Sequence, residues 1–123
     1  MTGLTFRKRG EPEERLDLSP LVPARLAGLS EREIAALPVG TSRMGLTVGD
    51  VFEVVGGDPS SICFAGGSTR FDRIGEAMQA GGIIVEGDAG ARLGRAMAGG
   101  RISVEGSVQG HAGSGMSGGV IRI

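Results

Sequence analysis

The sequence predicts an all-β protein, a parallel β-helix (solenoid) that follows a short α-helical lead-in at the N-terminus. Three observations support this prediction: a 19-residue repeat, alternating apolar residues within each copy of the repeat, and helix-start signals in the first 43 residues. Short, fixed periods are typical of architectures in which each unit packs on its neighbours.

The repeat occupies the C-terminal half of the chain. Met78, Met97 and Met116 recur at a spacing of 19 residues, and residues 73–91 match residues 92–110 at nine positions without a gap. We expect its glycines to mark corners, where a positive φ or a close backbone approach excludes a side chain, and its methionines to form an internal column. These structural positions are Gly75, Met78, Gly81, Gly94, Met97, Gly100, Gly113, Met116 and Gly119.

Each copy of the repeat also contains a strand pattern. Ile83 and Val85 lie two residues apart, as do Ile102 and Val104, so each pair points to one face of a strand. Stacking of parallel coils would place equivalent residues about 4.8 Å apart and form apolar columns. This face is the predicted core.

The first 43 residues carry a different pattern. Short strands are expected at residues 4–6 and 16–18, a helix that starts at Ser19-Pro20 and stops at Gly28, and a second helix behind the Ser30 capping box. Strand-like alternation begins at Leu46. We therefore expect a lead-in or cap over residues 1–43 and glycine-rich β-helix repeats over residues 44–123, truncated at the C-terminal end because Ile123 falls inside the third strand.

Composition excludes several classes of function. The formal net charge of −1 provides no electrostatic footprint for nucleic acid, and no polybasic membrane patch is present. The sequence has neither an eighteen-residue apolar run nor an apolar signal core, which predicts a cytoplasmic protein. One cysteine and one histidine are too few for an internal disulfide, an iron-sulfur cluster or a metal-ligand cluster, so no bound metal or cofactor is predicted for this chain.

Two pairs of residues resemble catalytic constellations. Glu86 and Glu105 would stack about 5 Å apart, near the carboxylate separation of retaining glycosidases, but the sequence has no Trp or Tyr to stack on sugar rings. Cys63 and His111 lack a third, orienting group. We predict no catalytic residue.

The column Arg73, Arg92 and His111 is the best candidate binding feature. Equivalent positions in successive coils would align three donors along a ridge that suits an anion or an acidic partner surface. A solvated basic corner is the alternative, with Asp72 and Asp88 as possible ion-pair partners.

Several motifs are similar to a known family. They are Phe71-Asp72-Arg73-Ile74-Gly75, the segment from Val85 to Gly90, and the recurring Gly-x-x-Met-x-Gly-Gly that begins at Gly94. They resemble the C subunit of formylmethanofuran dehydrogenase, and more closely the C subunit of the bacterial formyltransferase/hydrolase complex. The repeats are also similar to the C-terminal domain of the large glutamate synthase subunit, which implies a right-handed β-helix.

The resemblance implies a non-catalytic assembly subunit. Family complexes handle formyl groups on tetrahydromethanopterin and a methanofuran-type carrier, and the implied partners include a subunit related to the molybdopterin-binding chain. Neither nucleic acid nor a membrane is an implied partner.

Alternative functions remain open at this point. They are the C subunit of a tungsten or molybdenum formylmethanofuran dehydrogenase, a glutamate-synthase-like β-helix that spaces two active sites, and a self-assembling solenoid that binds an acidic ligand along the ridge.

Overall fold

The computed structural model describes residues 3–123. Eight strands and three short helices occur among these residues. The elements are β1 (Gly3–Lys8), β2 (Leu16–Asp17), α1 (Pro23–Leu26), α2 (Glu31–Ala35), α3 (Val48–Val51), β3 (Phe52–Val55), β4 (Asp58–Ala65), β5 (Phe71–Asp72), β6 (Gly82–Val85), β7 (Arg101–Val104) and β8 (Val120–Arg122).

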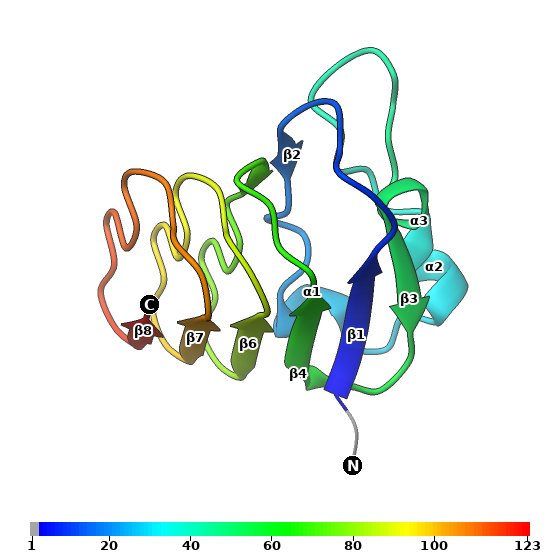
Figure 1. The fold of residues 1–123 in the computed structure, drawn as a ribbon. Helices are drawn as coiled ribbons and strands as arrows, with labels where there is room; N and C mark the ends of the chain where they lie inside the picture. Colours follow the sequence, from blue (N-terminus) through cyan, green and yellow to red (C-terminus); the bar gives the residue numbers. More distant parts are fainter. Residues whose placement is uncertain (1–2) are drawn as a thin grey trace.

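Six strands form one sheet in the order β3-β1-β4-β6-β7-β8, and β2 pairs with β5 in a second, two-stranded sheet. Figure 1 shows the large sheet as a row of arrows, with the helices α2 and α3 beside β3. All neighbours in the large sheet are parallel except β1 and β3, which are antiparallel.

The predicted all-β β-helix with a helical lead-in is therefore wrong. The fold is a mixed α/β arrangement with a mostly parallel six-stranded sheet and few helices. Two findings overturn the prediction: the first strand lies inside the sheet, between β3 and β4, and three consecutive helices stand between β2 and β3 in the chain. The repeat could not predict the position of β1 in the sheet. A repeated sequence indicates how neighbouring units pair with each other, but it does not indicate where a unique strand from a distant part of the chain pairs.

Some of the strands and helices predicted in the N-terminal half are present in the structure, and others differ from the prediction. The predicted strands are confirmed as β1 and β2, and Ser30 caps α2 with the expected capping box. The first helix starts later than predicted, with Val22 as N-cap and Pro23 in its first turn. The alternation predicted from Leu46 is wrong over α3, where Asp50 accepts a hydrogen bond from the Thr47 amide at 2.8 Å and fixes a helical turn.

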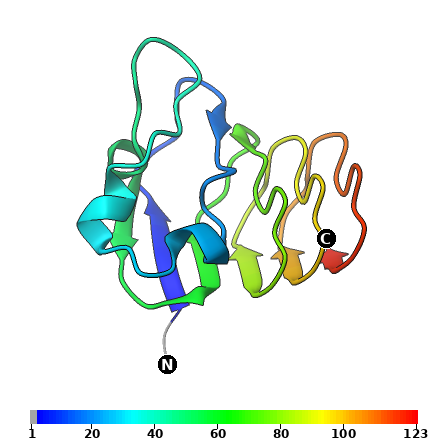
Figure 2. The same ribbon diagram turned by 180° about the vertical axis from the view of Figure 1, so that it is seen from behind.

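The 19-residue repeat places equivalent residues opposite one another in neighbouring parallel strands. Ile62, Ile83, Ile102 and Ile121 lie opposite one another across β4, β6, β7 and β8. The turns are also hydrogen-bonded between successive repeats: the Gly94 amide donates to the Ile74 carbonyl at 2.8 Å, and equivalent bonds join the second and third repeats. Figure 2 shows the resulting loops as nearly parallel arches beyond β6.

Four phenylalanines form the centre of the hydrophobic core. Phe6, Phe52, Phe64 and Phe71 are all fully buried, and their ring centroids lie 5.2–5.8 Å apart in the contacting pairs. They come from β1, β3, β4 and β5, so the cluster joins the unique strands to the beginning of the repeat.

Among residues 3–123, no helix combines the length and apolar character that a membrane span requires.

Candidate functional site

The predicted ridge residues Arg73, Arg92 and His111 begin successive repeats and share one unusual backbone conformation. Their φ angles are 60°, 60° and 68°, in the left-handed region. The Arg73 amide donates to the Ala91 carbonyl at 2.9 Å, and the Arg92 amide donates to the Gly110 carbonyl at 3.1 Å, so the three turns are stacked. The structure thus places the three residues at equivalent positions in neighbouring turns.

The side chains of this ridge differ in their partners. Arg73 forms an ion pair with Glu76 at 3.5 Å, whereas Arg92 and His111 are exposed and form no ion pair with residues 3–123. The suggested partners Asp72 and Asp88 are used elsewhere. Asp72 accepts two hydrogen bonds from Arg15, at 2.7 and 2.8 Å, and Asp88 accepts one from the Ser107 amide at 2.9 Å.

Several carboxylates hold the backbone in place. Asp72 also accepts a hydrogen bond from the Ala91 amide at 2.8 Å and so connects Arg15 to the second repeat. A hydrogen bond from Ser68 lowers the pKa of the Glu11 carboxyl, and amide hydrogen bonds at the N-caps of α2 and α3 lower the pKa of Glu33 and Asp50. The lowered pKa keeps Glu11, Glu33 and Asp50 ionised at neutral pH, and their hydrogen bonds stabilise particular turns.

The residues that resembled catalytic pairs have a different environment. Glu86 and Glu105 are exposed and follow the buried residues Val85 and Val104. Partial burial raises the pKa of the Cys63 thiol, and the carboxylates of Glu86 and Glu105 raise it further. The thiol is therefore protonated at neutral pH, which makes Cys63 a poor nucleophile. No group of three or more metal-ligating side chains is found among residues 3–123.

The structural positions of the repeat have regular geometry. Met78 and Met97 are buried and Met116 is half-buried. The six corner glycines have positive φ angles between 65° and 88°; they are Gly75, Gly81, Gly94, Gly100, Gly113 and Gly119.

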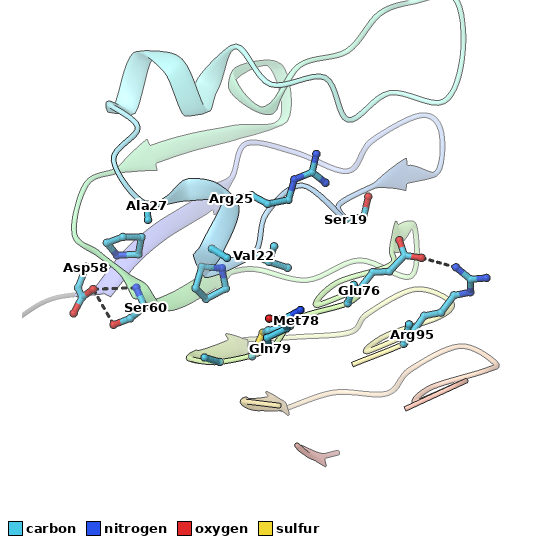
Figure 3. A pocket seen from close by; sticks show the side chains of 16 residues that line it. Ser19, Val22, Arg25, Ala27, Asp58, Ser60, Glu76, Met78, Gln79 and Arg95 are labelled. Carbon is cyan, nitrogen blue, oxygen red and sulfur yellow. Dashed lines mark hydrogen bonds and ion pairs between the residues drawn. The ribbon is translucent and has the colours of Figure 1, made fainter. Parts of the chain in front are cut away.

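An open groove of about 880 Å³ lies between α1 and the turns of the first two repeats. Its walls include Pro23, Ala24, Ala27, Ala77, Ala80 and Ala96. Figure 3 shows Asp58 and Ser60 at one end and the Glu76–Arg95 ion pair at the other. The Arg95–Glu76 distance is 2.7 Å, and Arg25 projects from α1 toward the same end.

Sequence reasoning missed this groove. The helix α1 and the repeat turns are far apart in the sequence, and nothing local indicates that they face each other. One signal was present: the repeat has Ala77 and Ala96 at two equivalent positions and Gly115 at the third.

Comparisons with known proteins give consistent matches, although no family model matches the chain. Over 88 residues the chain is 51% identical to the C subunit of the formyltransferase/hydrolase complex Fhc from Methylorubrum extorquens, a match that covers 72% of this chain and 33% of the relative. Over 81 residues it is 37% identical to the C subunit of molybdenum-containing formylmethanofuran dehydrogenase 1 from Methanosarcina barkeri, a match that covers 62% of this chain and 27% of the relative. The chain thus spans about a third or less of the length of these curated relatives.

Comparison with solved structures also finds a chain of a formyltransferase/hydrolase complex. The crystal structure of the formyltransferase/hydrolase complex (FhcABCD) from Methylorubrum extorquens, in complex with methylofuran, contains a chain that superposes with a TM-score of 0.89 and 51% identity. The match covers 95% of this chain and 44% of the solved one. The protein therefore belongs to the family formed by the C subunits of formyltransferase/hydrolase and formylmethanofuran dehydrogenase complexes.

Proposed function

We propose that the chain is part of the C subunit of a formyltransferase/hydrolase complex, in which it serves as a non-catalytic assembly subunit. The observation that supports this most directly is the 51% identity and 0.89 TM-score to a chain of the FhcABCD complex, over 95% of this chain. The lower identity of 37% to the molybdenum-containing dehydrogenase relative favours the formyltransferase/hydrolase branch.

The reaction of the whole complex follows from this proposal. Other subunits transfer a formyl group from tetrahydromethanopterin to a methanofuran-type carrier and hydrolyse it to formate, in one-carbon metabolism in the cytoplasm. A carrier of this type, methylofuran, is present in the related crystal structure. The partners of the chain are then the remaining subunits, including one related to the molybdopterin-binding chain.

The chemistry of the described residues supports an assembly role. The carboxylates of Asp72 and Asp88 accept hydrogen bonds from the backbone amides of Ala91 and Ser107 and fix turns of the repeat. The thiol of Cys63 has a raised pKa and is protonated at neutral pH. The two carboxylates therefore stabilise the fold, and the protonated thiol is a poor nucleophile.

The test separates assembly from turnover. The tagged, full-length protein is co-expressed with the other subunits, and formate release from a formylated furan carrier is measured for the protein alone, for the other subunits alone and for the assembled complex. We expect the tagged protein to capture the other subunits and to release no formate by itself. Formate release by the isolated protein would contradict the non-catalytic role, and the absence of captured subunits would contradict the assembly role.

A further inference from the structure

The groove between α1 and the repeat turns has walls of small apolar side chains. Ala24, Ala27, Ala77, Ala80 and Ala96 all line it and are all exposed to solvent. Sites for small molecules enclose most of the ligand surface, whereas an open apolar groove suits the face of a polypeptide segment. The shape therefore favours a segment of a protein as the occupant.

The repeat itself provides an internal comparison at this groove. Ala77, Ala96 and Gly115 occupy equivalent positions, and all three have left-handed φ angles, of 59°, 56° and 69°. Glycine adopts this conformation without strain, whereas alanine loses roughly 1 kcal/mol there. The alanines are found at the two positions that line the groove, and glycine at the position that does not. The two alanine methyl groups thus add apolar surface to the groove at a cost in backbone strain.

The charges of the groove specify the chemistry of the occupant. At one end, the carboxylate of Glu76 contacts the guanidinium groups of both Arg73 and Arg95. Arg25 lines the same groove and forms no ion pair or side-chain hydrogen bond with residues 3–123. Of the charged residues that line this end, Arg25 and Arg95 accompany the single carboxylate of Glu76, which leaves one positive charge that an acidic side chain would balance. At the other end, Asp58 accepts hydrogen bonds from Ser60 in its own turn, at 2.9 and 2.8 Å.

We infer that this groove binds a segment of another subunit, which lays apolar side chains against the alanines and places an aspartate or glutamate beside Arg25. The inference rests on the proposed function, because that function supplies the partner. It assigns the partner face to α1 and the first two repeats, a face distinct from the exposed ridge positions Arg92 and His111.

Charge reversal tests the inference in the full-length protein co-expressed with the other subunits of the complex. Arg25→Glu should lower the amount of captured subunits about tenfold or more, because a favourable pair becomes a repulsive one. Arg25→Lys should retain most of the capture. The matched control is Arg43→Glu, which makes the same charge change at an exposed arginine outside the groove and should have no effect. Circular dichroism of each variant verifies that it is folded.

Site-specific photo-crosslinking provides a second measurement that does not depend on destabilising the protein. p-Benzoylphenylalanine at Ala24, inside the groove, should cross-link to one peptide of a partner protein that contains apolar residues and an Asp or Glu. The same group at Ala36, outside the groove, should not cross-link to that peptide.

The outcomes separate the two proposals. If the wild-type protein captures no other subunit, the proposed function is wrong. The proposal that the groove binds a segment of another subunit is then wrong as well. If the wild-type complex assembles but Arg25→Glu assembles equally well, and Ala24 cross-links to no partner segment of this composition, the groove assignment alone is wrong. A small molecule, a second copy of this chain or another part of the same chain at Ala24 would likewise overturn it.

Discussion

Residues 3–65 and residues 66–123 share one sheet but are stabilised in different ways. The first region has three of the four phenylalanines, all three helices and the antiparallel pair of β1 and β3. The second has one phenylalanine and is built from in-register Ile and Val, buried Met78 and Met97, and turns that require positive φ. Packing of large side chains is therefore the main source of stability in residues 3–65, whereas strand register and turn geometry are more important in residues 66–123.

The comparison also shows how the two regions are joined. Lys8 donates a hydrogen bond to the Gly67 carbonyl at 2.7 Å, and Arg15 and Asp72 form two hydrogen bonds. Pro23 of α1 packs on Gly81, where a β-carbon would lie 2.8 Å from the proline ring. Residues 3–65 therefore cover the exposed side of the first repeat, in the place that an additional repeat would occupy.

The largest effect is expected from Phe64→Ala, in the centre of the aromatic cluster. Phe64 is fully buried, with ring centroids 5.3 Å from Phe6 and 5.8 Å from Phe52. Loss of the ring should lower the free energy of unfolding by about 3–5 kcal/mol, because the rigid strands around it cannot close the cavity. Urea denaturation followed by circular dichroism measures this change. A loss below about 1 kcal/mol would show that packing does not control the first region.

The second prediction concerns the turns of the repeat. Gly100 has a φ of 86°, and a β-carbon there would lie 2.5 Å from the Met78 methyl carbon and 2.8 Å from the Gly81 carbonyl oxygen. Gly100→Val should lower the free energy of unfolding by about 2–4 kcal/mol, through left-handed strain and overpacking. Gly110→Val is the matched control, because no atom lies within 4 Å of that position and its φ is not in the left-handed region. Equal stability of the two variants in urea would contradict the importance of the corner.

A smaller effect is expected at the left-handed turn position that Ala77, Ala96 and Gly115 share in the three repeats. Ala77→Gly should raise the free energy of unfolding by about 1 kcal/mol by relieving strain. Gly115→Ala should lower it by a similar amount, since the nearest atom to the added β-carbon would be 3.9 Å away and no clash contributes. Thermal unfolding of both variants measures the changes. If Ala77→Gly instead destabilises the protein, the methyl group makes a packing contact that outweighs its strain.

The smallest expected effect is a pH dependence of stability, which should be confined mainly to residues 3–65. Hydrogen bonds lower the pKa of Glu11, Glu33, Asp50 and Asp58 below the ordinary values of 4.5 for Glu and 3.8 for Asp, and all four lie within residues 11–58. A folded-state pKa below the unfolded one contributes stability above the unfolded pKa, and this stability is lost as the pH falls through the folded pKa. Acidification from about pH 5 to about pH 3 should therefore weaken residues 3–65 first.

Hydrogen exchange, corrected for the intrinsic exchange rate at each pH, measures this loss region by region. Glu33→Gln should reduce the pH dependence around α2, because the amide cannot titrate. Earlier loss of protection in residues 66–123 would contradict the assignment.

The sequence by itself determined the register of the repeat and several local elements. The spacing of Ile83 and Ile102 fixed which residues lie opposite each other in β6 and β7, because parallel neighbours of equal length must pair in register. Ser30 and Glu33 determined the start of α2, because a capping box needs only residues three apart. The family resemblance from the Phe71–Gly75 motif was also confirmed.

Only the tertiary structure decided the fold class and the candidate site. The position of β1 between β3 and β4 depends on contacts between residues distant in sequence, such as Phe6 with Phe52 and Phe64. The groove depends on the placement of α1 against turns that follow it only after two further helices and three strands. Periodicity describes interactions between neighbouring units, whereas non-local packing of unique segments is set by the burial of the whole aromatic core.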